Sequence, residues 1–503
     1  MRINNFVNDY LKIVRLLLIA FISSLSLISC DDMSTPPAKN KLSKLEKIKQ
    51  AGVLQVATRV DPTTYYPLPT GGYSGLEYDL VMLFAKQLGV KVKFQIPQKF
   101  ESILKKTIAG TVDIAAAGLT VTEERQKKLR FSPFYHKVSE QIIYSSRVAR
   151  PKTIADLENG ILEVTLGTSH TESLRLLQKK DHPNLTWISS QTLDSHQLLG
   201  LVNDGLIDYT VADSNQMILM RRFYPKLHIA FEIAKPRALA WALPLSKDDS
   251  LYNEVTAFFD RIKKDKTLAQ LLERHYGHAE KLTAFDKLKF DQRQRSRLPE
   301  YKPYFVEMGK KYNIDWRLLA AIGYQESHWE ESAISPTGVR GIMMLTKDTA
   351  KQVGVKNRID PKQSIQGGAL YFYQRLKVIP QRVQEPDRTW FALASYNVGF
   401  GHVEDARILT KRYGGSPDKW IDVKKFLAKL SQPSWHKQTK HGYARGHEPL
   451  VYVENIRNYY DLLVWQNHQK QEQQQILDNI NAPSFINNIF KSYFIFEFQE
   501  LLS

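Results

Sequence analysis

The sequence has almost no cysteine, and its first apolar run is short. Its 503 residues include one cysteine, Cys30, which excludes an internal disulfide. The apolar run at 16–28 is too short for a comfortable membrane span. Hydrophobic residues still make up 43% of the chain, which is enough for globular cores and too many for a disordered protein. Because one core rarely grows beyond about 250–300 residues, we expect at least two domains.

Acidic residues are also scarce relative to basic ones. Lys and Arg number 70 against 52 Asp and Glu, which gives a formal net charge of +18. Such a balance suits a polyanion, whether nucleic acid, anionic lipid or an acidic cell-wall polymer, and the charge alone does not choose among them. Metal-ligand clusters are missing as well, since His436, His441 and His447 are scattered through a basic loop. The sequence therefore predicts no metal and no cofactor.

The N-terminus has the pattern of an export signal. Basic residues precede the run at 16–28, which fits the apolar part of a secretory signal peptide over 1–29. The segment Leu27-Ile28-Ser29-Cys30 resembles a bacterial lipobox, which implies cleavage before Cys30 and lipid attached to it. An uncleaved signal anchor is the alternative. Export also removes the chain from nucleic acid, so we expect no nucleic-acid partner.

Lipid on Cys30 would make residues 30–44 a tether. Several acyl chains give stable anchoring where one is marginal. We therefore expect a membrane partner through the lipid anchor and a location on the periplasmic face of the outer membrane. Asp31 resembles an inner-membrane retention signal, so the inner membrane stays open as an alternative.

Residues 45–277 read as an α/β domain. Strand-like runs at 53–57, 90–94 and 209–213 alternate with helical patterns, of which 76–88 ends at Gly89. This alternation predicts α/β layers with a mainly parallel sheet. A second series of the same kind follows residue 151, and 238–244 looks like a returning strand. We predict two lobes with the chain crossing between them twice, which is a clamshell.

Three segments of this region carry a resemblance. They are Gly75-Leu76-Glu77-Tyr78-Asp79-Leu80, residues 116–125 and Phe131-Ser132-Pro133-Phe134-Tyr135. Together they resemble the periplasmic solute-binding proteins of the amino-acid type. The resemblance implies a regulatory, non-catalytic domain whose ligand is an amino acid or a stem peptide.

The same resemblance assigns ligand-binding roles. Thr120 and Arg125 would hold a ligand α-carboxylate and Asp213 its amino group, and a planar guanidinium does match a carboxylate. Tyr66, with Tyr65 beside it, would stack on the ligand. Two alternatives stay open: Arg125 lies in a charged run typical of a solvated face, and Asp213 stands where it would simply cap a helix.

The chain changes character after residue 277. Residues 278–298 are charged and lack strand signals, so they read as a linker or connecting helix. Residues 299–470 are almost entirely helical in pattern, and we predict helices at 315–327, 346–353, 365–376, 389–396, 403–412 and 450–465. The tail at 471–503 is Gln-rich and then aromatic, which suits either core packing or an amphipathic helix on a membrane.

Glu326 is the candidate catalytic residue. With Leu319, Ile322 and Gly323 it continues one helical stripe, and Asp315 is placed to cap that helix. Burial and the negative end of the helix dipole both raise the pKa of a carboxyl group there. A protonated carboxyl near neutral pH is what a general acid requires. Taken alone, a surface glutamate at a helix end is the better explanation of this residue.

Three motifs favour the catalytic interpretation. The stretches 326–345, 394–401 and 448–456 resemble, in order, the signature of the soluble lytic transglycosylases, although Met344 stands where many members have Gln. The resemblance implies a lysozyme-like, mainly α domain acting on peptidoglycan glycan strands. It implies cleavage of the β-1,4 bond between N-acetylmuramic acid and N-acetylglucosamine, with a 1,6-anhydro product and ligand-dependent regulation by the clamshell.

The resemblance also gives each site residue a role. Glu326 acts first as acid and then as base, and Tyr452 and Asn397 support the reacting sugar. Ser327, Met344 and Tyr396 line the glycan groove. Two alternatives remain. Glu330 or Glu331 would provide a second carboxylate for a hydrolase of goose-lysozyme type, a muramidase, or the chain is a non-catalytic wall-sensing lipoprotein.

Overall fold

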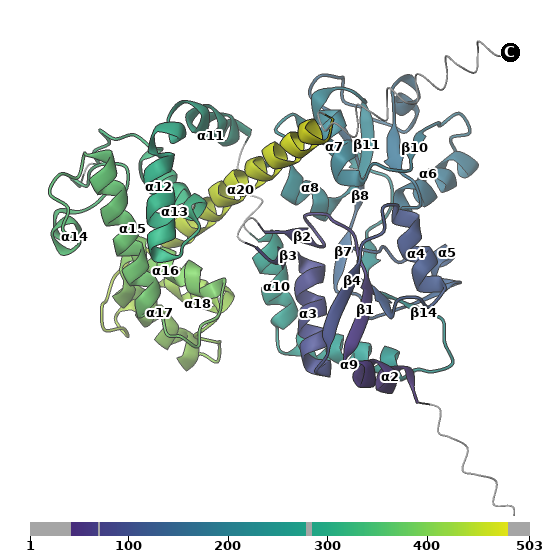
Figure 1. Cartoon of the computed structure of the whole chain (residues 1–503), viewed down its shortest axis with the longest axis horizontal. Helices are drawn as coiled ribbons and strands as arrows, with labels where there is room; N and C mark the ends of the chain where they lie inside the picture. The colour runs from purple at the N-terminus through teal and green to yellow at the C-terminus, as the bar shows by residue number, and fades with distance from the viewer. Residues whose placement is uncertain (1–41, 69–70, 278–283, 336, 481–503) are drawn as a thin grey trace, which may run out of the picture. The chain divides into compact units, whose positions relative to one another are not determined.

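The computed structural model describes residues 42–68, 71–277, 284–335 and 337–480 (Figure 1). The predicted signal peptide, Cys30 and Asp31 lie outside the described residues, as do the aromatic part of the tail and the first residues of the linker. A short helix, α2 (Lys44–Ala51), forms a unit of its own. Within the described ranges, no helix combines the length and the apolar character needed to cross a bilayer.

The first lobe is built on a five-stranded sheet of order β4-β1-β5-β14-β6. Strand β1 (Val53–Ala57) runs parallel to β4 (Lys91–Gln95) and β5 (Ile114–Ala115), as predicted. The prediction of a mainly parallel sheet is wrong for β14 (Ala242–Pro244), which is antiparallel to β5 and β6 (Leu129–Phe131). The direction reverses because β14 belongs to the part of the chain that returns from the second lobe.

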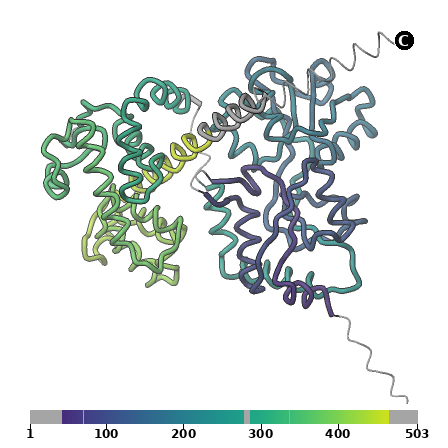
Figure 2. Tube along the Cα trace, in the orientation of Figure 1, coloured from purple at the N-terminus to yellow at the C-terminus, as the bar shows by residue number. Residues whose placement is uncertain are grey.

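Helices from both ends of this region cover the first lobe. Helix α3 (Leu76–Leu88) ends at Gly89 in the left-handed conformation with φ 70°, which confirms the predicted stop. In Figures 1 and 2, the purple elements from the start of the α/β region and the teal helices from its end lie together in this lobe. His275 Nε2 lies 2.9 Å from Asp79 Oδ2, so α10 packs against α3. The remaining elements of this lobe are β2 (Tyr66–Pro67), β3 (Tyr73–Ser74), α4 (Phe100–Ile108), α5 (Glu123–Gln126), α9 (Ser250–Lys264) and α10 (Thr267–Tyr276).

The second lobe contains a mixed arrangement of strands. Strand β8 (Glu140–Ser145) lies between β11 (Tyr209–Asp213) and β12 (Leu227–Glu232), antiparallel to both, so a parallel sheet is wrong here too. Strands β9 (Glu163–Thr165) and β10 (Ile188–Ser190) pair in parallel, and Leu162 forms a further parallel bridge with Tyr209. The other elements are a 3₁₀ helix (Ala155–Asn159), α6 (Ser169–Lys180), α7 (Ser195–Asp204) and α8 (Ser214–Met220).

Two strands connect the lobes. Strand β7 (His136–Val138) leads out of the first lobe, and β13 (Arg237–Leu239) leads back into it. They pair antiparallel, with Arg237 opposite Val138. The predicted double crossing is therefore confirmed, and the single predicted return strand at 238–244 is divided into β13 and β14.

The C-terminal region is helical, as predicted. Its helices are α11 (Ala284–Ser296), α12 (Leu298–Tyr312), α13 (Trp316–Ser327), α14 (Lys347–Gln352), α15 (Pro361–Val378), α16 (Asp387–Val398), α17 (Phe400–Arg412), α18 (Trp420–Lys429), α19 (Pro433–His436) and α20 (Glu448–Ile480). Helix α13 packs against α12 and α20, and α16 packs against α15, α17 and α20. Trp329, Phe391 and Phe305 are fully buried in the shared core. This packing places the end of α13 beside α20.

Candidate functional site

Glu326 occupies the last turn of α13. Asp315 is the N-cap of this helix, and its carboxylate accepts a hydrogen bond from the Arg317 amide at 3.0 Å, which confirms the predicted start. The helix ends at His328, whose φ of 54° is left-handed. Glu326 therefore lies where the helix backbone has its negative end, and its side chain is partly buried.

Tyr452 from α20 contacts the carboxyl group of Glu326 directly. Its hydroxyl donates to Glu326 Oε1 at 2.5 Å. Burial raises the pKa of Glu326 from 4.5 to about 7, and the Tyr452 hydrogen bond lowers it in part. No other charged side chain of the described residues contributes to this shift. Glu326 is thus a carboxyl group that holds its proton up to about neutral pH.

The two acidic residues that follow Glu326 have other surroundings. Glu330 Oε2 lies 2.6 Å from Arg297 Nη2, and the same arginine donates to the His328 carbonyl at 3.1 Å. Glu331 is exposed. Neither contributes to the pKa shift of Glu326, so the structure does not bring a second carboxylate to the first.

Three hydroxyl groups fix the turn that contains Met344. Ser327 Oγ donates to the Ile342 carbonyl at 2.9 Å, and Tyr396 Oη donates to the Met343 carbonyl at 3.0 Å. Ser364 Oγ accepts from the Met343 amide at 3.1 Å. Met344 itself has a φ of 44°, an unusual conformation for a side-chain-bearing residue, and is partly exposed.

The predicted groove residues therefore fall into two groups. Ser327 is buried, and Tyr396 is partly buried with its ring stacked on that of Tyr452 at 6.4 Å between centroids. The hydroxyl groups of both residues are hydrogen-bonded to the backbone of the turn. Asn397 is exposed at the end of α16, and Met344 is also accessible. Of this set, Asn397 and Met344 are the side chains most available to a bound glycan.

Gly341 begins the same turn and offers a test of its rigidity. A Cβ atom there would lie 1.8 Å from the Arg358 carbonyl oxygen, and its φ is +82°. Gly338 has a similar φ of +80° with open space around it. We expect Gly338→Ala to cost only the left-handed strain, about 1–2 kcal/mol, and Gly341→Ala to cost more and to displace the turn.

Calorimetry of both variants measures this difference. The expected result is a larger fall in the thermal transition of the helical region for Gly341→Ala than for Gly338→Ala. Equal falls would show that the Arg358 carbonyl moves aside freely, and that the turn is not held as tightly as its hydrogen bonds suggest.

In the α/β region, Arg125 is buried rather than on a solvated face. Its Nε donates to Glu172 Oε1 at 2.8 Å, its Nη1 to the Thr120 carbonyl at 3.1 Å, and its Nη2 to the Gly167 carbonyl at 3.2 Å. Arg125 and Thr120 belong to the first lobe, and Glu172 and Gly167 to the second. The guanidinium therefore joins the two lobes.

Asp213 lies at the end of β11 and contacts His170 from α6. The two side chains are both buried, with 3.2 Å between Nε2 and Oδ1. Asp213 also occupies the N-cap position of α8. Glu140 lies close by, and these three residues bring possible ligand atoms within 4.8 Å of one another. Sequence reasoning missed this group because its members are far apart in the chain.

Tyr66 and Tyr65 are placed differently from each other. Tyr65 is buried and stacks on Tyr73 with 4.5 Å between ring centroids. Tyr66 is partly buried in the β2–β3 hairpin, opposite Ser74. Among the described residues, no hydrogen bond or ring contact joins Tyr66 to Arg125, and the role of Tyr66 in ligand binding stays a prediction.

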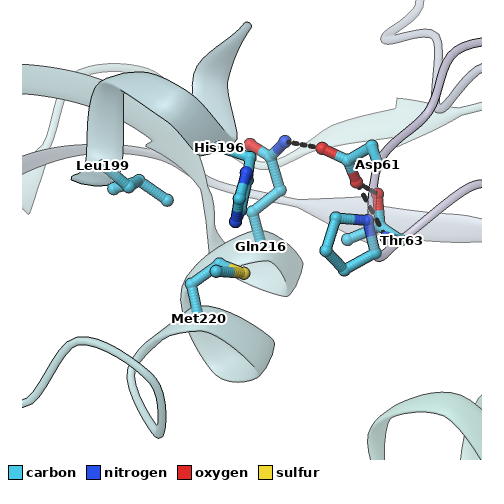
Figure 3. Close-up of a pocket in the computed structure, with 7 residues that line it drawn as sticks. Asp61, Thr63, His196, Leu199, Gln216 and Met220 are labelled. Carbon is cyan, nitrogen blue, oxygen red and sulfur yellow. Dashed lines mark hydrogen bonds between the residues drawn. The ribbon is translucent and has the colours of Figure 1, made fainter. Parts of the chain in front are cut away.

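A second polar contact joins the lobes at the pocket in Figure 3. Asp61 from the first lobe accepts a hydrogen bond from Gln216 Nε2 of the second lobe at 3.1 Å. The same carboxylate accepts from the Thr63 amide at 2.8 Å. Burial raises the pKa of Asp61, but Arg59 and the Thr63 hydrogen bonds outweigh it and lower the pKa overall. Asp61 is thus an ionised link between the lobes.

Two parts of the chain match known protein families. Residues 54–278 match the model of bacterial extracellular solute-binding proteins, family 3, and residues 303–418 match the transglycosylase SLT domain. Among solved structures, a mutant of ArgBP from T. maritima is 23% identical with a TM-score of 0.42, covering 46% of this chain and 99% of that protein.

Curated relatives span nearly the whole chain. The membrane-bound lytic murein transglycosylase F of Saccharophagus degradans is 46% identical over 440 residues, which are 88% of this chain and 87% of the relative. That of Pseudomonas fluorescens is 43% identical over 447 residues, covering 88% and 91%. The chain therefore belongs to the membrane-bound lytic murein transglycosylase F family.

Proposed function

We propose that this chain is a peptidoglycan lytic transglycosylase. It cleaves the β-1,4 bond between N-acetylmuramic acid and N-acetylglucosamine and leaves a 1,6-anhydro-muramic acid end. The observation that carries the proposal is one partly buried carboxyl group, Glu326, with a pKa of about 7 and no second carboxylate among the described residues influencing it. The SLT match over 303–418 supports the same reaction class.

Glu326 serves both proton transfers in this reaction. It first gives its proton to the glycosidic oxygen as the bond from that oxygen to C1 breaks. It then takes the proton of the C6 hydroxyl as O6 bonds to C1. The two transfers return Glu326 to its starting state, and no water is consumed. Hydrolases of this bond use two carboxylates, whereas here the substrate's own hydroxyl replaces water.

Tyr452 orients the carboxyl group for these transfers. Its hydroxyl engages Oε1, and among the described residues no side chain is hydrogen-bonded to Oε2. Oε2 is thus the oxygen that carries the mobile proton. Asn397 and Met344, both accessible, contact the glycan, with Asn397 suited to an acetamide. Ser327 and Tyr396 act indirectly, because their hydroxyls hold the turn at 341–344.

The remaining assignments concern organisation and location. Residues 45–277 bind an amino acid or stem peptide through Thr120, Arg125 and Asp213 and regulate cleavage. Residues 299–470 cleave glycan, and 278–298 connect the two. Lipid on Cys30 anchors the protein to a membrane facing the periplasm, with the outer membrane favoured. The solute-binding match over 54–278 supports the ligand-binding part of this proposal.

Mass spectrometry of muropeptides released from purified sacculi tests the reaction. An anhydro end is lighter by one water than the reducing end that hydrolysis leaves. We expect anhydro ends throughout the products. Products with only reducing ends would identify a muramidase instead, and would require a second carboxylate close to Glu326.

A further inference from the structure

The first turn of α6 brings Glu172 and His170 into contact with two of the proposed ligand-binding residues. Glu172 contacts the guanidinium of Arg125 at 2.8 Å, and the side chains are 16% and 4% exposed. His170 lies two residues earlier and contacts Asp213 at 3.2 Å, with side chains 4% and 8% exposed. The chain itself therefore fills the positions where a ligand carboxylate and a ligand amino group would bind.

Both terminal nitrogens of Arg125 also have partners. Carbonyl groups of Thr120 and Gly167 each accept one hydrogen bond from them. A ligand carboxylate that contacts Nε and Nη2 together must first displace Glu172, because Nε has a single N–H. Because Glu172 and Gly167 belong to the second lobe, displacement also breaks contacts that join the lobes.

Positive side chains already face the acids around this contact. Glu140, Glu172 and Asp213 are the acids, and Arg125 and Arg237 face them, with Arg237 Nη1 3.4 Å from Glu140 Oε1. Burial lowers the pKa of His170, but Asp213 and Glu140 outweigh burial and raise it overall, while Arg59 opposes them. A divalent cation at Glu140, His170 and Asp213 would have to compete with these arginine side chains.

We propose that His170 and Glu172 form an internal substitute for the charged groups of an amino acid, and that Glu172 holds the two lobes together through Arg125 when no ligand is bound. This inference rests on the proposed ligand-binding role of Arg125 and Asp213. An attached competitor has an effective concentration of about a millimolar or more. A free amino acid displaces it poorly, so the inference favours a larger ligand, such as a peptide with both charged groups and further contacts.

The distance between the lobes tests this without any ligand. Spin labels at Lys127→Cys in the first lobe and Lys179→Cys in the second lie at exposed positions, and Cys30→Ser in the full chain removes the only native thiol. The wild-type background is expected to give a short, narrow distance distribution. Glu172→Ala should broaden it toward longer distances, because it removes the contact with Arg125 in the first lobe. His170→Ala should leave it close to that of the wild type, because His170 and Asp213 both belong to the second lobe.

Matched controls use the same residue types elsewhere in the second lobe. Glu158→Ala and His182→Ala lie outside the contact and should leave the distribution unchanged. Distances that stay the same in Glu172→Ala overturn the inference. A wild-type distance that changes with added Zn²⁺ or with EDTA also overturns it, because a cation would then hold the cluster.

This outcome is separate from that of the proposed function. Calorimetric titration with the dipeptide L-alanyl-γ-D-glutamate reports whether the domain binds a wall-derived ligand at all, and muropeptide analysis reports cleavage. If the distances stay unchanged while the dipeptide binds and anhydro products form, only the internal substitute is overturned. If the distance lengthens in Glu172→Ala while the products carry only reducing ends, the internal substitute is supported and the proposed reaction is overturned.

Discussion

Replacing Glu326 with glutamine is expected to abolish turnover of purified sacculi. General acid–base catalysis contributes about 10²–10⁴-fold for one positioned group, and Glu326 serves both proton transfers in the proposed reaction. We therefore expect a loss at or beyond the upper end of that range. Glutamine has nearly the same shape and its carbonyl accepts the Tyr452 hydroxyl, so the fold should persist. Release of soluble muropeptides over time measures the loss.

Two neighbouring glutamates provide the matched controls. Glu330→Gln removes a carboxylate that is paired with Arg297, and Glu331→Gln removes an exposed one. Both variants should keep turnover close to that of the wild type. A loss in Glu330→Gln as large as that in Glu326→Gln would indicate a two-carboxylate hydrolase. Full turnover in Glu326→Gln would instead support a non-catalytic wall-sensing protein.

Locally encoded elements of this fold are predictable from the sequence. The helix over 76–88 and its stop at Gly89 follow from apolar spacing and a glycine, and the structure has the same bounds. The strand at 209–213 is likewise confirmed. No helix is predicted over α12, because Pro303 lies inside it and a proline normally marks a boundary. Tertiary packing of Phe305 and Met308 outweighs that local preference.

Features that depend on chain crossings were not predictable. The antiparallel direction of β8 and β14 is decided by where the chain leaves and re-enters a lobe, and no local pattern records this. The same holds for the site. Glu326 was found from one helical stripe, but the contact from Glu172 to Arg125 joins residues 47 positions apart. Sequence patterns predict a ligand-binding role for Arg125. They do not show that Glu172 of the same chain already contacts its guanidinium.

The raised pKa of Glu326 also predicts a pH-dependent cost to stability. In the unfolded chain the group ionises near 4.5, whereas in the folded protein burial holds the proton to about 7. Below pH 4.5 Glu326 is protonated in both the folded and the unfolded state, so its ionisation does not affect the free energy of unfolding. As pH rises toward 7, the unfolded state loses its proton first, so folding becomes progressively less favourable. Above 7 the cost is constant, at most about 3 kcal/mol, because each pKa unit corresponds to about 1.36 kcal/mol.

Glu326→Gln removes this titration and keeps the side-chain shape. The variant should therefore be more stable than the wild type, with a gap that opens as pH rises from 4.5 to 7 and then stays level. Thermal unfolding of both proteins across this range measures the gap, and other titrating groups cancel in the difference. The exposed Glu331→Gln should show no such gap. A gap that is independent of pH would mean that packing, rather than the ionisation of Glu326, separates the two proteins. A gap that grows toward low pH would reverse the sign of the shift and remove the basis for Glu326 as the proton donor.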